Sequence, residues 1–90
     1  MVRFLTRPGC HLCEDAYPLV FREAQKAGVT LEVFDIETDD TVLSEFGMRI
    51  PVVLGPDGEV LAEGQIERRA LRRALRRTGA RGWLRRPSPR

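Results

Sequence analysis

Several residue types are rare in this chain of 90 residues, and their scarcity narrows the functions open to it. The chain has no asparagine, one histidine, one lysine and two cysteines. With one histidine and two cysteines, a tetrahedral zinc site would need carboxylates as further ligands. No apolar run approaches the roughly 20 residues of a membrane-spanning helix. We therefore expect no bound metal and no membrane-spanning segment.

The chain also starts without the apolar core of a secretory leader, because Met1 to Arg7 reads directly as a short strand. A cytoplasmic location is therefore expected. Cys10 and Cys13 would close too short a loop to restrain much of the unfolded chain. In a reducing compartment, such a pair indicates redox chemistry or metal binding rather than a structural staple.

Positive charge is concentrated at one end of the chain, although the formal net charge is only +2. Residues 1–66 sum to about −7, and residues 67–90, with ten arginines and one glutamate, sum to about +9. Six of these arginines recur as pairs every four residues, namely Arg68, Arg69, Arg72, Arg73, Arg76 and Arg77. The favoured interpretation is a solvated helix face, and the alternative is a surface for nucleic acid or an acidic partner. No nucleic-acid motif accompanies them and Trp83 is the only aromatic nearby, so nucleic-acid binding is not expected.

Apolar periodicity predicts the element order β-α-β-(α)-β-β-α. Strands are expected at 2–6, 29–36, 50–54 and 59–62, and helices at 11–27, 41–46 and 67–78. The first crossover makes the first two strands parallel, and the last two form an antiparallel hairpin. Pro18 must kink the first helix, lie where a missing N–H is tolerated, or divide the helix into two pieces. We expect one monomeric domain at 1–79, followed by an Arg/Pro-rich tail at 80–90.

The two cysteines lie in the segment Thr6-Arg7-Pro8-Gly9-Cys10-His11-Leu12-Cys13, where the first strand gives way to the first helix. Unpaired N–H groups at a helix start favour the thiolate, which is the nucleophilic form of cysteine. One helical turn brings the second sulfur close to the first, so the pair can form a disulfide and exchange it. A static pair, or a dimer that bridges a metal or an iron–sulfur cluster through Cys10, is the alternative.

With this element order, the sequence resembles the thioredoxin superfamily, nearest to the glutaredoxins and glutaredoxin-like proteins. Three features carry the resemblance over residues 1–78: the Cys10-His11-Leu12-Cys13 motif, Pro18 inside the first helix, and Ile50-Pro51 at the start of the third strand. The resemblance implies an α/β fold of the minimal thioredoxin type, with a four-stranded mixed sheet flanked by helices.

The resemblance also assigns roles to residues of the expected site. Cys10 would be the exposed nucleophile, and Cys13 the buried thiol that resolves the mixed disulfide. Pro51 would be a cis-proline, presenting the backbone of Ile50 to an extended substrate and keeping metals from the thiols. His11 and Leu12, between the cysteines, would tune the reduction potential and the choice of partner.

Two further residues are candidates for binding substrate or tuning the thiol. Arg7 lies three residues before Cys10, where it could lower the pKa of the thiol or hold a substrate carboxylate. Gly64 could open the last helix to an anionic ligand. Glutathione-binding glutaredoxins typically carry Thr-Val before the cis-proline and a Gly-Gly before the last helix. This chain has Arg49-Ile50 and a single glycine at these places, which leaves glutathione specificity open.

The expected function is that of a thiol–disulfide oxidoreductase that reduces protein or glutathione mixed disulfides and binds no cofactor. Glutathione as co-substrate and a thioredoxin reductase fit equally well as the electron donor. The alternative is a binding module without redox turnover, either the cluster-bridging dimer or an adaptor that uses the arginine helix.

Overall fold

A computed structural model describes residues 1–78, so Gly79 and the expected tail at 80–90 lie outside the described residues. The four strands are β1 (Val2–Thr6), β2 (Leu31–Asp35), β3 (Val52–Leu54) and β4 (Val60–Glu63). The helices are α1 (His11–Ala27), α2 (Asp40–Phe46) and α3 (Arg68–Arg77), with a 3₁₀ turn, η1, at Ile36–Thr38. This is the predicted order with η1 added.

The strands form one mixed sheet in the spatial order β2-β1-β3-β4. β1 is parallel to β2 and antiparallel to β3, and β4 pairs antiparallel with β3. The parallel pair follows from α1, which carries the chain back across the sheet between the two strands. The α/β class and the mixed four-stranded sheet are therefore confirmed.

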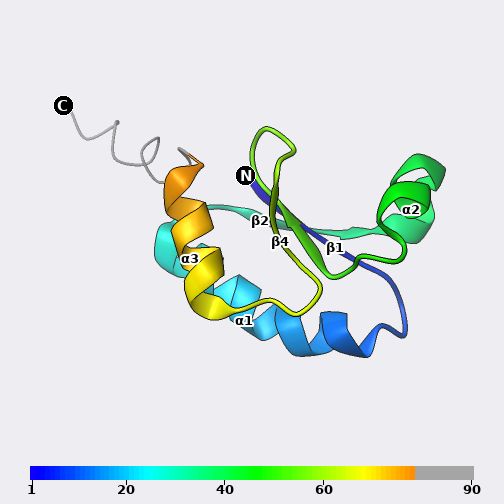
Figure 1. The fold of residues 1–90 in the computed structure, drawn as a ribbon, viewed down its shortest axis with the longest axis horizontal. Helices are drawn as coiled ribbons and strands as arrows, with labels where there is room; N and C mark the ends of the chain where they lie inside the picture. The colour runs from blue at the N-terminus through cyan, green and yellow to red at the C-terminus, as the bar shows by residue number, and fades with distance from the viewer. Residues whose placement is uncertain (79–90) are drawn as a thin grey trace.

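Helices cover the two faces of the sheet unequally. Figure 1 shows α1 and α3 together on one side, while α2 lies at one end of the sheet. The core under α1 and α3 contains Val2, Phe4, Val20, Val53 and Leu71. The smaller core next to α2 contains Leu5, Ile36, Phe46 and Val52. Neighbouring residues such as Phe4 and Leu5 enter different cores because side chains alternate along a strand.

Two strands start two residues later than periodicity alone predicts, and β4 starts one residue later, at Val60. β2 begins at Leu31 instead of residue 29, because the Val29 N–H donates to the Ala24 carbonyl (3.0 Å) and closes the end of α1. β3 begins at Val52 instead of residue 50. Its first two expected residues donate no N–H to the sheet, since the Ile50 N–H donates to the Phe46 carbonyl (3.1 Å) and Pro51 has no N–H.

α1 is a single helix of 17 residues that runs through Pro18. Periodicity predicts a mostly apolar stripe on this helix, made of Leu12, Ala16, Leu19, Val20, Glu23, Ala24 and Ala27. The structure differs at the first turn, where Leu12 is 54 % exposed and Cys13 is buried instead. Glu23, which falls within the same stripe, is also buried. Among residues 1–78, no helix has the length and apolarity needed to cross a membrane.

Candidate active site

Cys10 and Cys13 form a disulfide at the start of α1, with their Cα atoms 5.2 Å apart. Cys10 is the N-cap residue of the helix, and its sulfur accepts a hydrogen bond from the Cys13 N–H (3.2 Å). Cys13 is 1 % exposed and belongs to the main core, whereas Cys10 is half-buried at its edge. One sulfur is therefore within reach of a partner, and the other lies inside the domain.

A tight turn places Cys10 at the helix start. The Cys10 N–H donates to the Arg7 carbonyl (3.3 Å), and Gly9 within the turn has φ +80°. Residues with a side chain rarely adopt this left-handed conformation, so glycine suits the position. After the turn, the Glu14 N–H donates to the Cys10 carbonyl (3.0 Å) and begins the helical ladder. The sequence Pro8-Gly9 thus decides where the cysteine cap sits.

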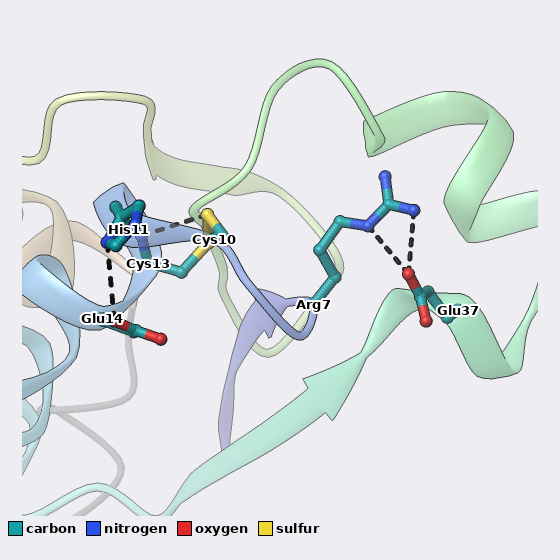
Figure 2. The surroundings of a disulfide bond; sticks show 6 residues. All are labelled: Arg7, Cys10, His11, Cys13, Glu14 and Glu37. Atoms are coloured by element: carbon teal, nitrogen blue, oxygen red, sulfur yellow. Dashed lines mark hydrogen bonds and ion pairs between the residues drawn. A yellow bond between two sulfur atoms is a disulfide. The ribbon is translucent and has the colours of Figure 1, made fainter.

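Arg7 does not reach the cysteines. Figure 2 shows its side chain directed away from the two sulfurs and towards Glu37. The guanidinium donates through Nε (3.0 Å) and Nη2 (2.8 Å) to Oε2 of Glu37. Glu37 is oriented by η1, where its N–H donates to the side chain of Asp35 (2.9 Å). Arg7 therefore ties the loop before Cys10 to the end of β2.

His11 and Leu12 lie on the exposed first turn of α1. The His11 imidazole is 96 % exposed, and its Nδ1 lies 3.8 Å from a carboxylate oxygen of Glu14 (Figure 2). Leu12 is 54 % exposed. The two residues between the cysteines thus offer solvent one polar ring and one apolar side chain, next to the half-buried sulfur.

The Ile50–Pro51 peptide bond is cis, and Pro51 is fully buried. Ile50 is half-buried and packs against both cores, including the core that Cys10 borders. Gly64 also belongs to this region, because its N–H donates to the Pro51 carbonyl (2.8 Å). The structure thus places Gly64 beside the proline, whereas the last helix begins only at Arg68.

An ion pair that was not predicted from the sequence links the Ile50–Pro51 loop to the end of β4. Arg49 Nε donates to Glu63 Oε1 (2.8 Å), and its guanidinium carbon lies 4.8 Å from the centre of the Phe46 ring. The hydrogen bond to Glu63 is the main reason that the pKa of Arg49 is raised. Met48, next to this arginine, is 99 % exposed. No local pattern marks the pair, because β3 and its hairpin turn separate the two residues.

The N-terminus of α3 is capped by the chain itself. Glu67 is the N-cap residue, and its Oε1 accepts a hydrogen bond from the Ala70 N–H (2.9 Å). A carboxylate therefore already occupies the position where an anionic ligand would bind to the first turn. The acid at this place is visible in the sequence, but its capping role depends on where the helix begins.

An apolar groove runs beside the buried cysteine, between α1 and β2. Its volume is about 380 Å³, and its lining includes Phe4, Cys13, Tyr17 and Val33. The Tyr17 ring lies 5.7 Å from that of Phe4, and Val33 is 51 % exposed.

Within residues 1–78, no group of three or more histidine, cysteine or acidic side chains could hold a metal ion.

Two solved structures share this arrangement of strands and helices. Target protein XcR50 from X. campestris is similar at a TM-score of 0.67 and 23 % identity, over 86 % of this chain and 97 % of that chain. Thioredoxin 1 from the thermophilic eubacterium Thermosipho africanus TCF52B is similar at a TM-score of 0.64 and 12 % identity, over 84 % and 90 % of the two chains. At these identities the likeness concerns the fold.

A search among curated proteins finds no match. The sequence model of the family described as glutaredoxin-like domain (DUF836) matches residues 1–76. This match covers both cysteines, the Ile50–Pro51 segment and nearly all of α3. The chain therefore belongs to the glutaredoxin-like domain family (DUF836), within the thioredoxin-like fold.

Proposed function

We propose that this protein is a thiol–disulfide oxidoreductase whose substrates are disulfides in other proteins and mixed disulfides with glutathione. The supporting observation is the unequal burial of the cysteine pair at the start of α1. Cys10 is half-buried at the helix cap, while Cys13 is 1 % exposed and lies one turn further along. An incoming disulfide can reach only the first sulfur, so the two thiols take different roles.

The proposed reaction begins with the reduced pair. The Cys10 thiolate attacks one sulfur of the substrate disulfide, which breaks the substrate S–S bond and releases one thiolate. The Cys13 thiol then loses its proton to solvent and attacks the Cys10 sulfur, which releases the second substrate thiolate. Two electrons have passed to the substrate, and the Cys10–Cys13 disulfide remains.

The N–H groups of the first turn assist the first step in this proposal. The Cys10 sulfur accepts a hydrogen bond from the Cys13 N–H, and hydrogen bonds to a sulfur are stronger when it is a thiolate. Arg7 is engaged by Glu37 and His11 points into solvent, so the helix start supplies the nearest donor. We place the reaction in the cytoplasm, where reducing conditions return Cys10 and Cys13 to the dithiol form.

We propose a protein reductase, of the thioredoxin reductase class, as the electron donor ahead of glutathione. Glutathione carries a carboxylate at each end. Near the Ile50–Pro51 loop, however, Arg49 is paired with Glu63, and the Gly64 N–H is taken by Pro51. The carboxylate of Glu67 caps the helix that follows and disfavours a second anion there.

The function is tested by titrating the purified protein against glutathione redox buffers, followed by alkylation and mass spectrometry. Reversible two-electron behaviour with Cys10 alkylated first below neutral pH is expected. In an insulin-reduction assay, Cys10→Ser should abolish turnover and Cys13→Ser should accumulate mixed disulfides. Wild-type turnover by Cys10→Ser would reject the mechanism. Thiols that never pair, together with iron or zinc after anaerobic purification, would favour the cluster-bridging dimer.

The donor is tested with Glu67→Ser, which keeps a helix-capping oxygen and removes the charge. Rates are measured with glutathione plus glutathione reductase, and separately with thioredoxin reductase. Glutathione-dependent turnover should be slow in the wild type and rise in the variant, while the rate with the protein reductase stays constant. Fast glutathione turnover that the substitution leaves unchanged would reverse the order of donors.

A further inference from the structure

The exposed face of α3 consists entirely of arginine. The exposed residues of this helix are Arg68, Arg69, Arg73, Arg76 and Arg77. Of its apolar residues, Leu71, Ala74 and Leu75 are buried and Ala70 is half-buried. The helix therefore presents positive charge to solvent with no apolar or aromatic side chain among it.

Little negative charge lies close to these arginines. Glu23 of α1 forms one ion pair with Arg72 (3.0 Å) and a longer one with Arg68 (3.9 Å). Arg69, Arg73, Arg76 and Arg77 make no ion pair with any residue in 1–78. Arginines three and four positions apart are neighbours on a helix, so they repel one another and weaken it. A surface that only met solvent would gain stability from interspersed acids, and this face has none.

A cleft continues the positive surface between α3 and the C-terminal half of α1. It has a volume of about 260 Å³, and its charged lining residues are Glu23, Lys26, Arg72 and Arg76. The single carboxylate is already neutralised, since both of its oxygens accept hydrogen bonds from Arg72. The cleft thus carries a net positive charge and adjoins the exposed arginines.

Against the expectation from the sequence alone, we infer that this α3 surface, with the adjoining cleft, binds the phosphate backbone of nucleic acid without sequence preference. Guanidinium groups match phosphate with two parallel hydrogen bonds, and successive turns of the helix repeat the same charge along its axis. Counterions released from the nucleic acid on contact would drive the association. The like-charge repulsion within α3 would be relieved at the same time.

The chemistry of the surface favours nucleic acid over an acidic protein. Protein interfaces draw most of their affinity from buried aromatic or aliphatic anchors, and the exposed face of α3 has none. Phosphate contacts need only positive donors. The absence of aromatics on α3 also predicts that bases are not stacked or read there, so the binding should tolerate any sequence.

This surface and the disulfide lie in different parts of the molecule. The disulfide is at the N-terminal end of α1, whereas α3 packs against its C-terminal half, where Glu23 meets Arg72 (Figure 1). The oxidoreductase reaction and the binding surface are therefore separable by mutation. Nucleic acid held by α3 would leave Cys10 open to a disulfide substrate.

The test uses the full chain and fluorescence anisotropy with a labelled random-sequence duplex of about 20 base pairs, from about 50 to about 200 mM salt. The variant is Arg69→Gln, Arg73→Gln and Arg76→Gln combined. A matched pair of single variants, Arg73→Gln and Arg22→Gln, controls for net charge, because Arg22 is exposed on α1 and makes no ion pair with described residues. Insulin reduction is measured in parallel.

Wild-type affinity should fall as salt rises, and the triple variant should lower the salt slope by about three, or about one per arginine. Arg73→Gln should weaken binding more than Arg22→Gln, with insulin reduction unchanged in all variants. No binding at about 50 mM salt would overturn the inference. So would equal affinity of wild type and triple variant, which would assign binding to the arginines beyond residue 78. If the protein bound poly-L-glutamate but not the duplex, the inference would be wrong, and the partner of this surface would be an acidic protein.

Discussion

Glu23 of α1 accepts two hydrogen bonds from the guanidinium of Arg72 on α3, at 3.0 and 3.1 Å. The carboxylate is 1 % exposed, while the arginine side chain is 39 % exposed. Lys26 and Arg68 lie 3.8 and 3.9 Å from the same carboxylate. The contact between the two helices that cover the sheet therefore contains a buried charge that cations from both helices surround.

The two partners of this ion pair should respond differently to mutation. Arg72→Ala leaves a buried carboxylate with only the more distant Lys26 and Arg68, so we expect the larger loss of stability. Glu23→Leu removes the buried charge and leaves Arg72 free to turn into solvent, so its effect should stay within about 1 kcal/mol of zero. Urea unfolding at neutral pH measures both. A larger loss for Glu23→Leu would contradict this account.

The same carboxylate should contribute to the acid sensitivity of the fold. The hydrogen bond from Arg72 lowers the pKa of Glu23 below its ordinary value, although burial opposes the shift. A lowered folded-state pKa means that the unfolded chain takes up the proton first. The stabilisation is therefore complete above the unfolded pKa and is lost as pH falls through the folded pKa. Unfolding free energies from pH 7 towards pH 3, compared with those of Glu23→Gln, should converge in acid; a constant difference would refute this.

Gly9 should matter to the thiol as well as to stability. With φ +80° and open space where a side-chain carbon would stand, Gly9→Ala should cost about 1–2 kcal/mol through the backbone alone. Gly58 has φ +81° and equally open surroundings in the β3–β4 turn, so Gly58→Ala is a matched control. Both variants should lose similar stability, but only Gly9→Ala should alter the alkylation rate of Cys10. Identical alkylation rates would show that the turn does not position the cysteine.

Arg7 should contribute little to the reactivity of Cys10, because its guanidinium is bound to Glu37. Arg7→Gln is expected to leave the pH dependence of the Cys10 alkylation rate unchanged. The loss of stability should be within the roughly 0–1 kcal/mol of an exposed ion pair. Glu37→Gln serves as the control, since it breaks the same pair and leaves the arginine free. If Arg7→Gln moves the profile and Glu37→Gln does not, Arg7 acts on the thiol directly.

Local patterns in the sequence predicted most of the fold. The bounds of β1 and α1 agree with the structure, because an apolar strand pattern ends at Pro8-Gly9 and a helical pattern ends at Gly28. The later starts of β2 and β3 were not predictable in this way, since they depend on where the backbone N–H groups of Val29 and Ile50 find acceptors. The turn η1 was also missed, because it relies on the side chain of Asp35 accepting the Glu37 N–H.

In α3, too, local patterns did not predict which residues would come into contact. Periodicity placed Arg72 with the other arginines on a solvated face, and the structure instead brings it to the buried Glu23. The available signal was an acid within the apolar stripe of α1, because a buried carboxylate requires a cationic partner. Which of six arginines supplies that partner depends on how α1 and α3 pack, and periodicity within one helix does not contain that information.

The sequence by itself determined the order of elements and the cysteine pair at a helix start, since each depends on residues close together in the chain. The mixed sheet joins distant residues, such as Arg3 of β1 and Leu54 of β3, and was expected from the resemblance to the thioredoxin superfamily. Only the tertiary structure decided that Arg7 turns to Glu37, that Gly64 bonds Pro51, and that Arg49 pairs with Glu63. These contacts join residues from different elements. The type of a side chain and its position in the chain allow several partners. The geometry of the packed elements decides which of them it contacts.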